Sequence, residues 1–169
     1  MSYKGFKETD THIYFYGSIY SNFTSCKNLL IDFTKYTCTE QYFMAKKATL
    51  FGDYNILSQI MHSTNPAFQK QLGRMVEGFN PEIWDEHKYY VMCNAVYAKF
   101  SQNEDFKTAL LATGNKSLVE GSPSDKVWGV GIHYESPDIL DEKNWKGENL
   151  LGLALMDARD KLRGRHNGD

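Results

Sequence analysis

Two Asn-Pro pairs fix where helices begin in the middle of this chain. Asn65-Pro66 and Asn80-Pro81 each place a capping side chain directly before a proline. Proline is favoured at the first position of a helix because its missing N–H has no partner there in any case, and asparagine is a favoured cap. The first pair predicts a helix to about Glu77, and the second predicts the longest helix of the chain, to about Ser101.

Short helices and short strands are expected on both sides of this centre, from capping residues, apolar spacing and β-branched or aromatic runs. The other expected helices are 40–50 with Thr39 as its cap, 54–62, 104–113 and a last helix that ends near 162. The expected strands are 12–16, 29–33, 117–120 and 127–132, and the first two could pair as a hairpin. Residues 133–146 are expected to form a long polar loop. The sequence therefore predicts a mostly helical α+β single domain with a small β-sheet, over residues 1–169.

Composition narrows the classes of protein. The 169 residues fit one domain, and the formal charge of −2 argues against a protein that holds nucleic acid mainly by phosphate neutralisation, although one phosphate group could still be bound. The three cysteines are odd in number and form no CxxC, which favours a reducing, intracellular setting. The N-terminus is not a secretory signal and no apolar run could span a bilayer, so we expect a cytoplasmic protein.

One glycine-rich stretch, residues 122–132, combines a carboxylate, an indole and two glycines. Asp125 stands three residues before Trp128, and Gly129 and Gly131 let backbone approach a ligand closely. Such a stretch suits the binding of a planar ring beside an acid or base. The alternative is a turn with a buried tryptophan and a solvated carboxylate.

A second candidate lies on the helix expected at 40–50. Glu40, Phe43 and Lys47 share one face of that helix. Glu40 is either an acid that gains from the helix dipole or an acid that points into a pocket. Further on, a glycine inside a helix, Gly73, indicates close packing or the close approach of a ligand. Arg159 on the last helix is interpreted as part of a solvated face with ion pairs.

Short matches in order along the chain resemble the NADAR family, named for its link to NAD and ADP-ribose chemistry. They are Ser21-Asn22-Phe23, Thr39-Glu40-Gln41-Tyr42-Phe43, Lys47, Gly73-Arg74, Trp84, Ala98-Lys99-Phe100, 110–114, 118–123, Asp125, 128–131, Trp145, Gly147, 149–152, Leu155-Met156 and Arg159. The match covers about residues 12–162. The sequence departs from the family at Met44, where the family tends to have glutamine, and at Ala48, where it tends to have a large aromatic residue.

The resemblance implies a hydrolase that cleaves the C–N bond between a ribose and a nitrogenous group, without metal or organic cofactor. Such a reaction passes through an oxocarbenium-like state and needs carboxylates near the anomeric carbon. Glu40 and Asp125 are the expected catalytic residues: Glu40 for water activation or cation stabilisation and Asp125 for the sugar or leaving group, with the reverse assignment open. The expected substrate-binding residues are Asn22, Phe23, Lys47, Arg74, Trp84 and Trp128, of which Lys47 and Arg74 would bind phosphate.

Three functions remain open at this stage. The first is an N-glycosidase acting on a small phosphorylated ribosyl compound, such as the ribosylamino-pyrimidine phosphates of riboflavin biosynthesis. The second removes ADP-ribose from guanine bases in nucleotides or nucleic acid. The third is a non-catalytic module that binds ADP-ribose, which the departures at Met44 and Ala48 keep open. The net charge of −2 fits a small substrate better than a nucleic acid.

Overall fold

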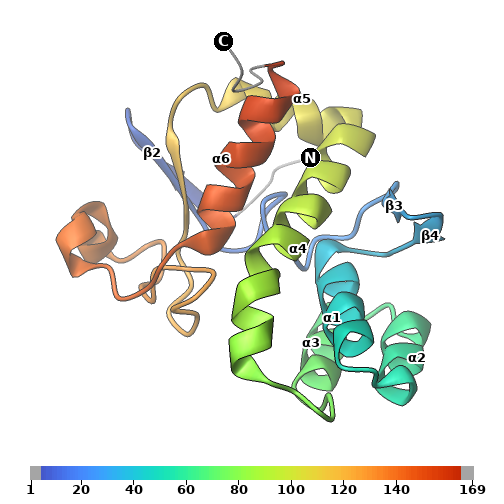
Figure 1. Ribbon diagram of the computed structural model, residues 1–169. Coiled ribbons are helices and arrows are strands. Elements are labelled where there is room, and N and C mark those ends of the chain that lie inside the picture. The colour runs from blue at the N-terminus through green and yellow to red at the C-terminus, as the bar shows by residue number, and fades with distance from the viewer. Residues whose placement is uncertain (1–4, 165–169) are drawn as a thin grey trace. The chain divides into compact units, whose positions relative to one another are not determined.

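The computed structural model describes residues 5–164 and contains six α-helices with short strands (Figure 1). This confirms the α+β class with mostly helical content. The described residues divide into two compact units. Residues 22–103 form the helical unit, and residues 5–21 with 104–164 form the sheet unit.

The helical unit holds the four helices of the central chain: α1 (Thr39–Leu50), α2 (Tyr54–His62), α3 (Pro66–Gly73) and α4 (Pro81–Gln102). The caps and helix starts predicted at both Asn-Pro pairs are confirmed, because Asn65 Oδ1 accepts the Phe68 N–H at 3.1 Å and Asn80 Oδ1 accepts the Glu82 N–H at 3.0 Å. Helix α1 packs against α2, α3 and α4 (Figure 1). The third helix ends at Gly73, earlier than the expected Glu77.

The start of α1 differs from the prediction. Cys38 is the residue before the helix, and Thr39 is the first helical residue rather than its cap. The Thr39 hydroxyl instead lies 3.1 Å from the backbone oxygen of Asn22 and 3.0 Å from its side-chain Oδ1. The Glu40 N–H also donates to the Asn22 oxygen, at 3.1 Å. A neighbouring segment therefore satisfies the first turn of α1, so no cap from the preceding residue is needed.

The strand expected at 29–33 is a hairpin of its own. Strands β3 (Leu30–Ile31) and β4 (Thr34–Lys35) pair antiparallel, and the expected pairing with residues 12–16 is wrong. Asp32 and Phe33 between them have φ angles of 49° and 63°, the left-handed pair that a two-residue hairpin turn requires. The carboxamide of Gln102 accepts from and donates to the backbone of Leu30, at 2.7 Å each, and so fixes the hairpin to α4.

The sheet unit is built on a three-stranded mixed sheet in the order β1-β2-β5. The central strand β2 (His12–Phe15) pairs antiparallel with β1 (Phe6–Glu8) and parallel with β5 (Ser117–Glu120). Helix α6 (Leu150–Leu162) packs along β5 and contacts α5 (Glu104–Ala112). The strands at 12–16 and 117–120 and both helices were predicted, whereas β1 was not.

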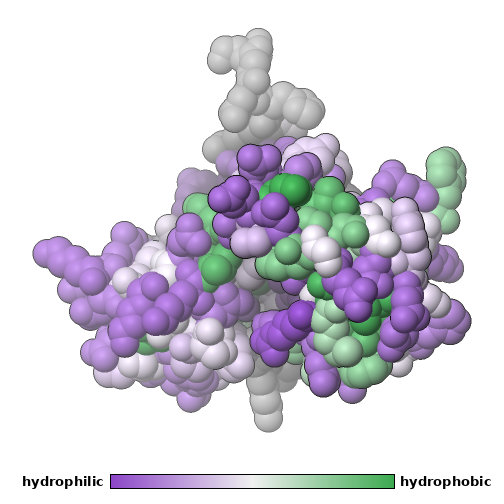
Figure 2. Space-filling model, turned by 60° about the horizontal axis from the view of Figure 1, so that its bottom comes forward, coloured by the Kyte–Doolittle hydropathy of each residue, from purple (hydrophilic) through white to green (hydrophobic). Residues whose placement is uncertain are grey.

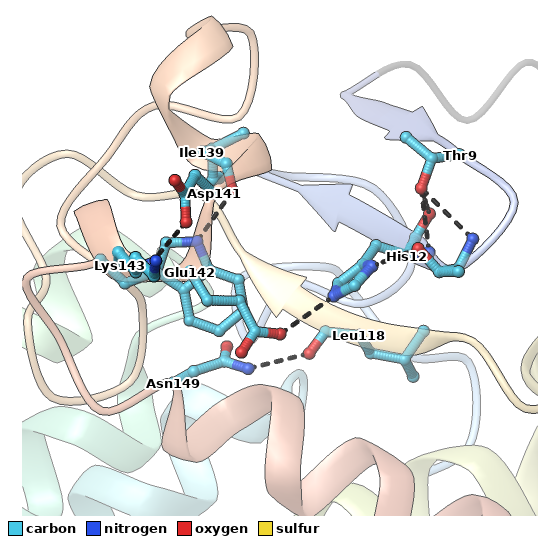
Figure 3. A network of polar contacts seen from close by, with 10 residues as sticks. Thr9, His12, Leu118, Ile139, Asp141, Glu142, Lys143 and Asn149 are labelled. Atoms are coloured by element: carbon cyan, nitrogen blue, oxygen red, sulfur yellow. Dashed lines mark hydrogen bonds and ion pairs between the residues drawn. The ribbon is translucent and has the colours of Figure 1, made fainter.

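A network of polar contacts joins the strands to residues 133–149 (Figure 3). His12 Nε2 lies 3.3 Å from the Glu142 carboxylate, and the Asn149 amide donates to the Leu118 oxygen at 2.9 Å. The expected loop is irregular apart from two 3-10 turns, Pro137–Leu140 and Glu142–Asn144. The Trp145 indole donates to the Ile139 oxygen at 2.8 Å between them. The loop is therefore tied to the sheet at several points.

Large apolar side chains remain exposed among polar ones, as the face in Figure 2 shows. In the helical unit they include Phe23, Phe68 and Phe79, each between 40% and 44% exposed. Within residues 5–164, none of the helices combines the length and the apolar character that crossing a bilayer would take.

Candidate functional site

Six of the eight predicted site residues lie in the helical unit: Asn22, Phe23, Glu40, Lys47, Arg74 and Trp84. Asn22 is held at the first turn of α1 by the two contacts from Thr39 and by the Glu40 N–H. The Glu40 side chain is buried, with 5% of its surface exposed. Asn22 and Glu40 are therefore fixed next to one another, and Glu40 is a buried acid in the first turn of α1.

Positive charge accompanies this carboxylate. Partial burial lowers the pKa of the Lys47 ammonium, the charge of Glu40 acts in the opposite direction, and the charge of Arg74 lowers it further. Lys47 thus lies within the electrostatic reach of both residues. Arg74, which caps the C-terminus of α3, is exposed. A buried acid with two cations close by is an arrangement that can hold an anionic ligand beside a carboxylate.

The predicted aromatic contacts of the helical unit differ in their exposure. Trp84 is buried, and its ring packs on Phe43 with 4.9 Å between the centroids. Phe23 is 40% exposed and has the Lys70 ammonium 5.8 Å from its ring centroid. Phe23 is therefore partly accessible at the surface, whereas Trp84 supports the buried face of α1.

Asp125 and Trp128 lie in the sheet unit, on residues 122–132. The strand expected at 127–132 is absent, because Asp125 folds the segment into a turn. Its Oδ1 accepts the backbone N–H groups of Val127 at 3.0 Å and Trp128 at 2.8 Å. Gly131, with a φ of 71°, bends the chain again three residues later. The Asp125 carboxylate therefore has a structural role in this turn.

The turn is also joined to the start of α6. The N–H groups of Leu150 and Leu151 donate to the carbonyls of Val127 and Trp128, both at 3.1 Å. These are donors that the first turn of a helix leaves without an internal partner. The contact is close enough that a Cβ at Gly147 would lie 2.3 Å from the Gly129 oxygen. Asp125 and Trp128 are thus carried on a rigid turn rather than on a loose loop.

Comparison with known proteins assigns the family. The NADAR domain pattern matches residues 5–163. The N-glycosidase R617 of Acanthamoeba polyphaga mimivirus is 42% identical over 166 residues, which cover 91% of this chain and 98% of that protein.

The chain belongs to the NADAR domain family.

Other relatives agree with this membership. The protein irg-1 of Caenorhabditis elegans is 44% identical over 130 residues, 76% of this chain and 61% of that protein. The N-glycosidase YbiA of Escherichia coli is 32% identical over 158 residues, 90% of this chain and 89% of that protein. The NMR structure of E. coli YbiA superposes with a TM-score of 0.74 at 29% identity, and the match covers 96% of this chain and 92% of that chain. The resemblance seen in the sequence is confirmed.

Both positions at which this NADAR domain departs from the family pattern, Met44 and Ala48, lie in the packed interior of the helical unit. A Cβ at Gly73 would lie 1.8 Å from the sulfur of Met44, so the two positions are packed directly against each other. Close packing, rather than the approach of a ligand, is therefore the reason for glycine at this position. Met44 is itself buried at 6% exposure, and Ala48 is fully buried. Both departures thus fill the core of the helical unit.

A functional candidate that the sequence did not reveal is Lys99 on α4. Its side chain is 1% exposed, and burial lowers the pKa of its ammonium to about 8, against the opposing influence of Cys26 and Cys38. Burial also raises the pKa of both thiols. A buried lysine with a lowered pKa is typical of functional sites. The signal in the sequence is the run Ala98-Lys99-Phe100, which matches the family but did not mark Lys99 as a site residue.

Arg159 corrects the interpretation of α6 as carrying a solvated charged face at this position. It is 5% exposed, and its Nη1 donates to Thr113 Oγ1 at 2.9 Å and to the Lys116 oxygen at 2.7 Å. These bonds hold the chain that leads into β5. Arg159 is therefore a buried structural cation, and its place in the family pattern has a packing reason.

The part of the chain that the structure describes, 5–164, contains no cluster of side chains that could form a metal site. No three His, Cys, Asp or Glu side chains gather there as a metal site would require. The candidate residues of the helical unit are one carboxylate, two cations, one amide and two aromatic rings.

Proposed function

We propose that this protein is an N-glycosidase that hydrolyses the C–N bond of a phosphorylated ribosyl compound, with ribosylamino-pyrimidine phosphates of riboflavin biosynthesis as the first substrates to test. Family membership supports this, because several of its matched relatives are named N-glycosidases. The single observation that carries the proposal is the burial of Glu40 at 5% exposure, with Lys47 and Arg74 close enough to act on one another's charge.

The proposed chemistry starts with departure of the leaving nitrogen. The C–N bond breaks, its electron pair goes to the nitrogen, and the ribose gains the character of an oxocarbenium ion. Glu40 stabilises this cation or takes a proton from the attacking water, whose oxygen forms the new bond to the anomeric carbon, and one proton of that water ends on the leaving nitrogen. Asp125 is assigned to the sugar hydroxyls or to the leaving group, through the oxygen that its turn does not use. The products are a free base and a sugar phosphate.

The cations and the polar side chains have separate proposed roles. Arg74 can bind a phosphate through two parallel N–H groups, and Lys47 supplies a point charge. Asn22 is proposed to bind the ribose or base, and its fixed place next to Glu40 supports this. Phe23, Trp84 and Trp128 are proposed to contact the planar base, and Phe23 is more exposed than Trp84.

A second candidate function is the removal of ADP-ribose from guanine, by the same bond cleavage. The exposure of Arg74 and Phe23 favours it, because an open site accepts a substrate larger than a ribosyl monophosphate.

Two hydrolysis assays distinguish these functions. The protein is incubated, without added metal, with a ribosylamino-pyrimidine phosphate and separately with ADP-ribosylated guanosine, and the released base is quantified. Release from the first substrate supports the first proposal, and release from the second alone supports the other. Tight ADP-ribose binding by calorimetry with no product in either assay refutes both and leaves a binding module.

The carboxylates are tested by isosteric amides. Glu40→Gln is expected to lower turnover by at least 100-fold, because a general base contributes on the order of 10² to 10⁴ in rate. Glu82→Gln is the matched control, since Glu82 is also an acid in the first turn of a helix but is exposed. Asp125→Asn keeps an oxygen for the turn, so a loss of turnover in a folded variant reports chemistry. Full activity in either site variant removes that residue from the mechanism.

A further inference from the structure

The connection between α3 and α4 contains Phe79, whose ring contacts Lys47, a residue of the proposed site. Residues 74–80 are anchored by Asp53, whose Oδ2 accepts the Glu77 N–H at 2.9 Å. Gly78 follows with a φ of 74°, a backbone conformation that glycine adopts without strain. Phe79 comes next, directly before the cap of α4, and its ring stands edge-on to Phe51 with 5.3 Å between centroids at 73°. Both the backbone and the ring of Phe79 are therefore held in place.

The ammonium of Lys47 lies over the ring of Phe79. The Nζ atom lies 4.4 Å from the centroid of the Phe79 ring, well within the range of a cation–π contact. Phe79 is nevertheless 43% exposed, so it is not simply a core residue. Lys47 has four rotatable bonds, and without such a contact its ammonium would spread over many positions. The ring favours one of them.

Two effects disfavour the charged form of Lys47, and the contact with Phe79 opposes them. Arg74 is close enough to disfavour the charged form of Lys47, and partial burial disfavours it as well. The charge of Glu40 acts in the opposite direction and favours the charged form of the ammonium. A contact with the electron-rich face of Phe79 keeps the ammonium charged without using one of its N–H donors on a carboxylate.

We propose that Phe79 is a positioning residue: it holds the Lys47 ammonium charged and in place for the anionic group of the substrate. This inference rests on the proposed function in assigning that group to a phosphate. It makes Phe79 a determinant of affinity for phosphorylated over unphosphorylated substrates, and not a catalytic residue.

Inorganic phosphate is the probe, because its binding can be measured by calorimetry without any hydrolysis. Phe79→Leu keeps the apolar bulk and removes the ring face, and should weaken phosphate binding about fivefold, the effect of a cation–π contact of intermediate exposure. Phe79→Tyr retains the face and should restore wild-type affinity. Phe68→Leu is the matched control, because Phe68 is 44% exposed in the same unit. Urea unfolding of each variant shows that it is folded.

The pairing of the two residues is tested by a double mutant. Lys47→Met should weaken phosphate binding more than Phe79→Leu does, and the double variant should bind no worse than Lys47→Met alone. In hydrolysis of a ribosyl phosphate, Phe79→Leu should raise KM about fivefold and leave kcat unchanged. Equal phosphate affinity of wild type and Phe79→Leu, or a further loss in the double variant, overturns the inference. A wild type that binds phosphate but hydrolyses neither substrate overturns the proposed function alone.

Discussion

Replacing Lys99 by methionine should stabilise this protein. Lys99 is 1% exposed on α4, and burial lowers the pKa of its ammonium from the ordinary 10.5 to about 8. Methionine has a similar length and fills a core without a charge to desolvate. The change therefore removes the cost of keeping an ammonium away from water, while most of the packing is retained.

The magnitude follows from proton linkage. Each tenfold change in proton affinity corresponds to about 1.4 kcal/mol, so a pKa lowered from 10.5 to about 8 corresponds to roughly 3 kcal/mol. Below pH 8 the lysine is protonated in both the folded and the unfolded chain, and the full cost is present. Between about pH 8 and 10.5 the unfolded chain binds more protons, so the stability of the wild type rises with pH relative to the variant.

Urea unfolding of the wild type and Lys99→Met at pH 7 and at pH 10 measures both effects. The variant should be more stable by about 3 kcal/mol at pH 7, and the difference should shrink toward zero at pH 10. Titration of the tyrosines is common to both proteins and largely cancels in the difference, whereas the Cys26 thiol loses the influence of the Lys99 charge, which lowers its pKa in the wild type. Lys27→Met is the control, because Lys27 is exposed. A Lys99→Met variant that is less stable than wild type at pH 7, or a difference that does not change with pH, refutes the reasoning.

Two further stability predictions use the same unfolding assay. Asn149→Ala should destabilise the fold by about 3–5 kcal/mol, since it leaves the Leu118 oxygen and the Glu120 N–H without the buried amide that binds both. A loss below about 1 kcal/mol would contradict this. Asp53 accepts the N–H groups of Glu77 and Ile56, which lowers its pKa below the ordinary 3.8. The stability that this gives is present above pH 3.8 and is lost as the pH falls through the lower folded value, so Asp53→Asn should reduce the acid sensitivity of unfolding.

Local signals predicted most of the helices. Asn65 and Asn80 act as caps as expected, because capping involves atoms within three residues of each other. Such short-range contacts do not depend on the rest of the fold. Thr39 failed as a cap for the converse reason, since its hydroxyl is used by Asn22, seventeen residues earlier in the chain.

Strand pairing depended on contacts that local patterns do not encode. The run at 29–33 had the right composition, but Asp32 and Phe33 turn the chain within it. Residues 127–132 also looked like a strand, yet Asp125 and the first turn of α6 use the backbone groups that a sheet would need. A β-propensity reports only that a segment fits a pleated surface, and the partner decides the outcome.

The amino-acid order by itself determined most of the helix starts and the family, and it predicted the residue types of a candidate site, because these rest on short spacings and on side-chain chemistry. Only the tertiary structure decided which charges are buried. It placed Glu40 and Lys99 out of water, left Arg74 exposed and gave Arg159 a structural role. The physical reason is that burial is a property of everything packed around a side chain, and those neighbours come from distant parts of the chain.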